Sequence, residues 1–163
     1  AKNPKEIAFF DRGPVDSTQM GDGGSWSVYW YNGVLVSSEI SRGLDIFELA
    51  PSAFISQNEI DAAKSVRFEY LNAQGQPKLV WPATFALARA YVDQLERSRG
   101  LAAGRITAVR QALSSAEQAS GAGRQRALAQ LATQLDADAS GAGEAAKVRA
   151  LAAAVRELGA ATR

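Results

Sequence analysis

Acid–base or metal chemistry in this chain would fall to carboxylates, lysines and tyrosines, because its 163 residues include no histidine and no cysteine. This composition excludes Cys/His zinc sites, thiolate nucleophiles and every catalytic triad that uses an imidazole. The best remaining cluster is Glu39, Arg42 and Asp45, which lie three residues apart around a predicted turn. We favour a structural role, in which Arg42 is held between the two carboxylates and fixes the turn. The alternative is a site in which Glu39 acts as a base or a metal ligand.

Aromatic side chains form a second candidate site, which consists of Trp26, Tyr29, Trp30 and Tyr31. Rings with one polar edge can stack on sugars and other planar ligands. Rings in such a strand more often belong to a core, and this is the interpretation that we favour. We therefore expect no catalytic residue, no metal, no cofactor and no enzymatic activity.

The charge and hydropathy of the chain exclude several classes of partner. Its 18 Lys and Arg residues oppose 17 Asp and Glu, a net charge of +1, whereas a dedicated nucleic-acid binder carries a strong basic excess. No apolar run approaches the roughly 20 residues that a membrane span needs, and no signal-peptide pattern opens the chain. Because the chain begins with Ala1 and its one methionine is Met20, we expect a fragment or a processed product.

The C-terminal half has a basic character that suggests one further partner. An anionic cell-wall or other surface polymer could bind it, although the interspersed acidic residues favour an ordinary solvated face. The arginines concerned are Arg97, Arg99, Arg105, Arg110, Arg124 and Arg126.

Residues 1–50 are predicted to form an antiparallel β-meander that needs cover on both faces. Asn32-Gly33 between two β-rich runs is typical of a type I′ hairpin turn. Both faces of the sheet would carry large rings, whereas a half-buried sheet has one polar face. A sheet covered on both faces is typical of a β-propeller blade. The four strands are expected at residues 7–10, 26–31, 34–37 and 44–49.

Residues 51–82 are predicted to be a connector. Ser56 and Glu59 have the spacing of a capping box, which would open a short helix that ends near Ser65. An extended arm is expected to follow this helix and to reach Pro82, where the preceding residue is forced out of the helical region.

Residues 83–163 are predicted to be an Ala-rich antiparallel helical bundle. Apolar residues recur at alternating spacings of three and four, and the sequence Ala119–Gly123 is repeated at Ala139–Gly143. The expected fold class is therefore α+β, with one four-stranded antiparallel propeller-type blade, a connector and an all-α antiparallel helical bundle.

Several of these motifs together resemble a known family. Residues 24–33 (GSWSVYWYNG) and 38–49 (SEISRGLDIFEL) resemble the C-terminal end of bacterial LVIVD-repeat proteins, which are surface or secreted β-propellers. Residues 3–8 look like the segment that follows the same strand of a preceding repeat. The resemblance continues through residues 57–63 and 80–82.

The resemblance implies the last blade and helical tail of an exported or cell-surface propeller, secreted or periplasmic or at the surface of a bacterium. Its partners would be the remaining blades or another protein subunit. The implied function is that of a non-enzymatic structural or interaction module. The alternatives are a carbohydrate or cell-wall binding module, or part of a propeller enzyme whose site lies mainly in the other blades.

Overall fold

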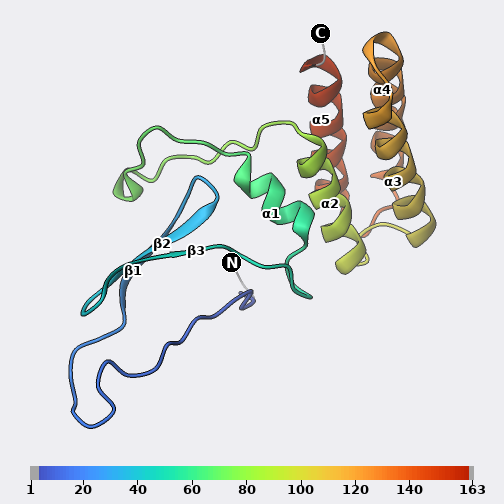
Figure 1. Ribbon diagram of the computed structural model, residues 1–163. Helices are drawn as coiled ribbons and strands as arrows, with labels where there is room; N and C mark the ends of the chain where they lie inside the picture. The colour runs from blue at the N-terminus through green and yellow to red at the C-terminus, as the bar shows by residue number, and fades with distance from the viewer. Residues whose placement is uncertain (1–3, 162–163) are drawn as a thin grey trace. The chain divides into compact units, whose positions relative to one another are not determined.

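The computed structural model describes residues 4–161, so the ends of the predicted first and last segments, residues 1–3 and 162–163, lie outside the described residues. The chain divides into two compact units, Ala1–Val80 and Trp81–Arg163 (Figure 1). None of the helices between residues 4 and 161 is both long enough and apolar enough to cross a membrane. The elements are β1 (Ser25–Tyr31), β2 (Val34–Glu39), β3 (Gly43–Phe47), α1 (Gln57–Lys64), the 3-10 helix η1 (Ala73–Gly75), α2 (Phe85–Arg97), α3 (Ala103–Gln118), α4 (Gly121–Asp138) and α5 (Ala145–Ala161).

The first unit contains an antiparallel sheet with the strand order β1-β2-β3. Tyr31 pairs with Val34, so Asn32 and Gly33 alone make the turn between β1 and β2. Their φ angles of 49° and 98° are both positive, as a type I′ turn requires. The predicted Asn-Gly hairpin is confirmed.

The sheet has three strands where four were predicted, because residues 7–10 form no strand. The Asp11 carboxylate accepts the backbone N–H of Gly13 at 2.7 Å, and Gly13 has a φ of 74°. The chain therefore turns directly after residues 7–10, and this segment has no strand pairing. The segment contacts the sheet through side chains instead: the ring centroids of Phe10 and Phe47 lie 4.6 Å apart.

The predicted fold class, a four-stranded blade followed by an all-α bundle, is therefore wrong. Residues 4–161 form three strands and five α-helices, and the first of these helices, α1, belongs to the same unit as the sheet. A short apolar run such as residues 7–10 satisfies the local pattern of a strand whether or not the chain supplies a partner for it.

Helix α1 begins at the predicted capping box. The Ser56 hydroxyl accepts the N–H of Glu59 at 3.2 Å, and the Glu59 carboxylate accepts the N–H of Ser56 at 2.7 Å. Two backbone donors at the start of the helix are thereby satisfied, which confirms the expected helix start. The helix buries Ile60 and Ala62, and Lys64 at its end lies against Gly33, where an added Cβ would approach Lys64 Cγ to 3.0 Å.

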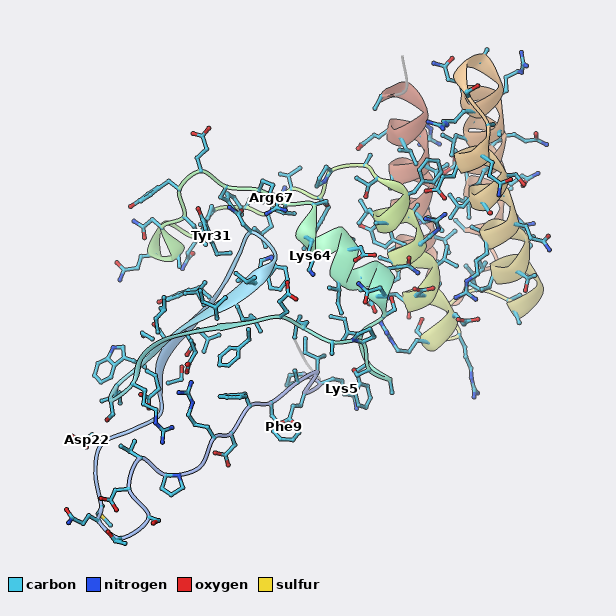
Figure 2. The ribbon with its side chains drawn as sticks, in the orientation of Figure 1. Lys5, Phe9, Asp22, Tyr31, Lys64 and Arg67 are labelled. Atoms are coloured by element: carbon cyan, nitrogen blue, oxygen red, sulfur yellow. The ribbon has the colours of Figure 1, made fainter. Side chains whose placement is uncertain are left out.

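The arm after α1 is attached to the tip of the β1–β2 hairpin (Figure 2). Asn32 Nδ2 donates to the Phe68 carbonyl at 2.8 Å, and Asn32 Oδ1 accepts the Phe68 N–H at 2.7 Å. Arg67 donates to the Asn32 carbonyl at 2.8 Å, and the Tyr31 hydroxyl donates to the carbonyls of Phe68 and Glu69. One turn residue thus holds the arm through paired hydrogen bonds, in the way that a neighbouring strand would hold it.

The second unit has one apolar core to which α2, α3, α4 and α5 all contribute. Helix α2 packs against α3 and α5, and α4 packs against α3 and α5. The apolar residues that recur at spacings of three and four in the sequence supply the buried side chains of these helices. The large side chains in this core include Val92, Leu95, Ile106, Val109, Leu113, Leu128, Leu135, Val148, Leu151 and Val155.

Candidate functional site

The two faces of the sheet carry different side chains, because partners across the strands share a face and neighbours along a strand alternate. We call one the phenylalanine face and the other the tyrosine face. The phenylalanine face carries Ser25, Val28, Trp30, Leu35, Ser37, Glu39, Asp45 and Phe47. The tyrosine face carries Ser27, Tyr29, Tyr31, Val34, Val36, Ser38, Leu44 and Ile46.

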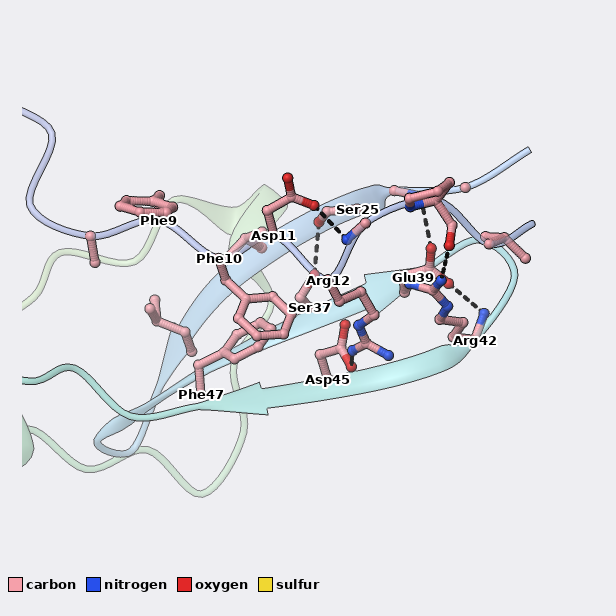
Figure 3. A pocket seen from close by; sticks show the side chains of 18 of the residues that line it. Phe9, Phe10, Asp11, Arg12, Ser25, Ser37, Glu39, Arg42, Asp45 and Phe47 are labelled. Atoms are coloured by element: carbon pink, nitrogen blue, oxygen red, sulfur yellow. Dashed lines mark hydrogen bonds and ion pairs between the residues drawn. The ribbon is translucent and has the colours of Figure 1, made fainter. Parts of the chain in front are cut away.

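A cavity of about 770 Å³ lies between residues 8–24 and the phenylalanine face (Figure 3). We call it the phenylalanine cavity, because the rings of Phe9, Phe10 and Phe47 line it. The hydroxyls of Ser25 and Ser37 meet across its floor at 2.7 Å. All three members of the predicted polar cluster, Glu39, Arg42 and Asp45, also line this cavity.

Glu39 holds the turn that follows β2. Its carboxylate accepts the backbone N–H groups of Gly24 at 2.7 Å and Ser41 at 2.8 Å, and also that of Arg42. The hydrogen bond from Gly24 is the main cause that lowers the pKa of Glu39, and the Ser41 and Arg42 bonds and the Arg42 charge add to it. A carboxylate that accepts three N–H groups is a poor general base, because its lone pairs are already engaged.

The predicted fork, with Arg42 held between Glu39 and Asp45, is replaced by longer-range contacts. The Arg42 guanidinium donates to the Pro14 carbonyl at 2.8 Å. Asp45 forms its ion pair with Arg12, whose guanidinium also lies over the Phe10 ring, 5.4 Å from the centroid. Sequence reasoning missed Arg12 and Phe10, because they meet β3 across more than thirty residues, and no local spacing signals such a contact.

We expect the Glu39→Gln variant to be less stable than the wild type, because one amide oxygen cannot replace two carboxylate oxygens that accept three N–H groups. The folded-state pKa of Glu39 lies below its ordinary value of 4.5. Its stabilising contribution is therefore fully present above that pH and is lost as the pH falls through the lower folded-state value. Urea midpoints at pH 7 and pH 3 should thus differ less in the variant than in the wild type.

The matched control for this experiment is Glu48→Gln, because Glu48 lines the same cavity but keeps an exposed side chain with only a long ion pair to Lys64. Its urea midpoint at pH 7 should stay close to the wild-type value. Equal midpoints and equal pH dependence for Glu39→Gln and the wild type would contradict the role assigned to Glu39.

The four residues of the predicted aromatic site do not lie together in the structure. Tyr29 and Tyr31 line a second cavity of about 660 Å³, together with Val36 and residues 69–74, which we call the tyrosine groove. Trp26 lies at an irregularity in the β1–β2 pairing and is 80 % exposed. Trp30 is half-buried on the phenylalanine face. Neither tryptophan lines the phenylalanine cavity or the tyrosine groove.

Several arginines of the second unit are engaged within the chain. Arg110 donates to Asp93 at 2.8 Å and to Glu96 at 2.7 Å, and the hydrogen bond with Glu96 is the main cause that raises its pKa. Arg105 pairs with Asp138 at 2.7 Å. Arg124 donates to backbone carbonyls at the end of α3. Such pairing reduces the positive charge available to an anionic polymer.

Within residues 4–161, no group of three or more carboxylates is placed to hold a metal ion. No family model, no curated protein and no solved structure matches the chain. The resemblance to LVIVD-repeat proteins therefore stays a prediction, and function has to be argued from the two cavities and the exposed surface.

Proposed function

We propose that the chain is a non-enzymatic interaction module, the C-terminal part of an exported or cell-surface β-propeller protein. The observation that carries this proposal is the exposure of the tyrosine face. Leu44 is 62 % exposed, Ile46 63 % and Tyr29 47 %. Contiguous exposed apolar side chains of this kind mark an interaction surface.

We propose that the apolar side of a neighbouring sheet packs on the tyrosine face, as adjacent blades do in a propeller. The strand residues of the tyrosine face carry no charge, so a charged partner would gain no ion pair from them. Rows of aromatic and aliphatic side chains, such as Tyr29, Val36 and Ile46, interdigitate with a second sheet about 10 Å away. The outer edges of β1 and β3, which pair with no described strand, are also available to further β-structure.

The non-enzymatic part of the proposal follows from the polar cluster. Glu39 accepts three backbone N–H groups, and Asp45 is paired with Arg12. Both carboxylates are thus engaged in contacts that hold the fold, which supports a structural role over a general acid–base role.

Light scattering and the fluorescence of the dye ANS test the proposal on the full chain. The wild type should self-associate and bind ANS, because Leu44 and Ile46 on the tyrosine face are exposed. The double variant Leu44→Thr/Ile46→Thr keeps β-propensity and should reduce both signals, whereas Met20→Thr, an exposed site outside the strands, should change neither. A longer chain that restores preceding propeller blades should be monomeric and should melt cooperatively.

A wild-type chain that runs as a 17.3 kDa monomer and binds no ANS would contradict the proposal. So would a double variant that behaves like the wild type.

The competing function is a carbohydrate-binding module, which the tyrosine groove favours. Tyr29, Tyr31 and Tyr70 line this groove together with Asn72 and Gln74, and rings beside amides suit sugar rings and hydroxyls. Binding to a glycan array that is lost in Tyr70→Ala, but kept in Trp26→Ala, would replace the interaction module by this function.

A further inference from the structure

We infer that the phenylalanine cavity is a binding site for an organic cation, a guanidinium or ammonium group carried on a small apolar body. The inference rests on the rings, the net charge and a guanidinium that the cavity already holds. It concerns the phenylalanine face and is independent of the interface proposed for the tyrosine face.

The size and the rings of the cavity suit a small ligand. Its volume of about 770 Å³ lies within the roughly 300–1,000 Å³ of ordinary ligand sites. Phe9 and Phe10 line it while remaining exposed, so their rings are available to a ligand. Phe47 lies below Phe10 with the two ring planes tilted by 47°, which gives the site an aromatic wall.

The charge of the lining favours a cation. Five carboxylates line the cavity against two guanidinium groups, which leaves a net negative charge that concentrates cations in a cleft. Hydrogen bonds from Thr18 lower the pKa of Asp16, and those from Gly24, Ser41 and Arg42 lower that of Glu39, so both stay ionised in mild acid. The charged residues are Asp11, Asp16, Glu39, Asp45 and Glu48, with Arg12 and Arg42.

The cavity already holds one guanidinium by the contacts that a ligand would use. Arg12 lies over the Phe10 ring at 5.4 Å from the centroid and forms an ion pair with Asp45 (Figure 3). Cation–π attraction and a charge-assisted hydrogen bond are together the usual means of binding an organic cation. The Arg12 side chain is 35 % exposed, so it can reach solvent, whereas the Asp45 side chain is only 15 % exposed and stays in the cavity. A ligand cation can therefore take its place while Arg12 turns into solvent.

The experiment compares two ligands of nearly the same shape, phenylguanidine, which is cationic at pH 7, and phenylurea, which is neutral. Each is titrated into the full-length chain, and binding is followed by the NMR shifts of backbone amides. Phenylguanidine should shift the amides of Phe10, Asp45 and Phe47, and phenylurea should bind at least tenfold more weakly. Added salt should weaken the binding of phenylguanidine, because the attraction is electrostatic. Equal affinities for the two ligands would overturn the inference.

Two variants of the cavity and one matched control complete the test. Asp45→Asn should weaken phenylguanidine binding at least tenfold. Arg12→Gln removes the internal competitor and should tighten binding severalfold, a gain that a misfolded chain could not produce. Asp136→Asn breaks an exposed ion pair with Arg156 in the second unit and should leave the affinity unchanged. Weaker binding in Arg12→Gln, or shifts confined to the second unit, would contradict the site.

Discussion

Replacement of Leu113 by alanine is expected to lower the free energy of unfolding of the helical unit by about 2–5 kcal/mol. Leu113 is fully buried in α3, within the core that the four helices share. A small domain is stable by only about 5–15 kcal/mol in total. This one substitution should therefore remove a large part of the stability.

The loss should lie in the upper half of that range, because five of the eighteen buried residues of the surrounding core are alanines. The cost of a cavity depends on how far its neighbours can move to fill it. An alanine methyl group has no side-chain torsion that could carry it into the space. The buried alanines of the cluster are Ala88, Ala116, Ala132, Ala139 and Ala152.

Urea unfolding followed by circular dichroism at 222 nm measures this loss. The matched control is Gln111→Ala, which lies on the exposed side of the same helix and should change stability by less than about 0.5 kcal/mol. A Leu113→Ala chain within about 1 kcal/mol of the wild type would show that the core relaxes around the cavity and that the alanine argument is wrong.

Features that depend on short sequence spacings were predictable. The Asn32-Gly33 turn follows from two neighbouring residues that tolerate positive φ, and the start of α1 follows from Ser56 and Glu59 at a separation of three. The apolar stripes of α2 to α5 follow from the helical repeat. In each case the physical cause acts within one turn of chain, so the sequence contains all of it.

Features that depend on distant partners were not predictable. Residues 7–10 have the composition of a strand, but composition does not determine whether they pair with the sheet. The chain turns at Asp11, and Phe10 contacts Phe47 of β3 through its side chain. The partner of Asp45 proved to be Arg12 and that of Asn32 proved to be Phe68. Each pair is separated by more than thirty residues, so no spacing rule could select it.

The long sequence separation between contacting residues also explains why the sequence predicted only one wall of each cavity. Glu39, Asp45, Tyr29 and Tyr31 were recognised from their types, and all four line a cavity. The opposite wall of each cavity comes from a segment without regular pairing, residues 8–24 in one case and residues 69–74 in the other. The position of such a segment depends on a few side-chain contacts, so its sequence alone does not determine where it lies.

Replacement of Asn32 by alanine should destabilise the sheet unit by about 3 kcal/mol, for two separate reasons. Alanine at a φ of 49° is disfavoured by about 1–2 kcal/mol, because its Cβ crowds the backbone. The variant also loses the two hydrogen bonds to Phe68, each worth about 1 kcal/mol. Asn32→Gly avoids the first loss, since glycine adopts positive φ freely, but still loses the two hydrogen bonds, and should be destabilised by about 2 kcal/mol.

Hydrogen exchange at the Phe68 amide distinguishes this account from a general loosening of the hairpin. The Asn32 side chain is the acceptor of that N–H, so exchange should accelerate at least tenfold in Asn32→Gly, although the turn itself still forms. Asn32→Asp keeps the acceptor but sets a carboxylate against the Phe68 carbonyl, and should fall between glycine and alanine in stability. Asn72→Ala is the matched control, because Asn72 caps η1 in the same arm at an ordinary φ of −106° and should leave the Phe68 amide protected. Unchanged exchange at Phe68 in Asn32→Gly would mean that contacts other than this side chain hold the arm, and the tyrosine groove would then not depend on the hairpin turn.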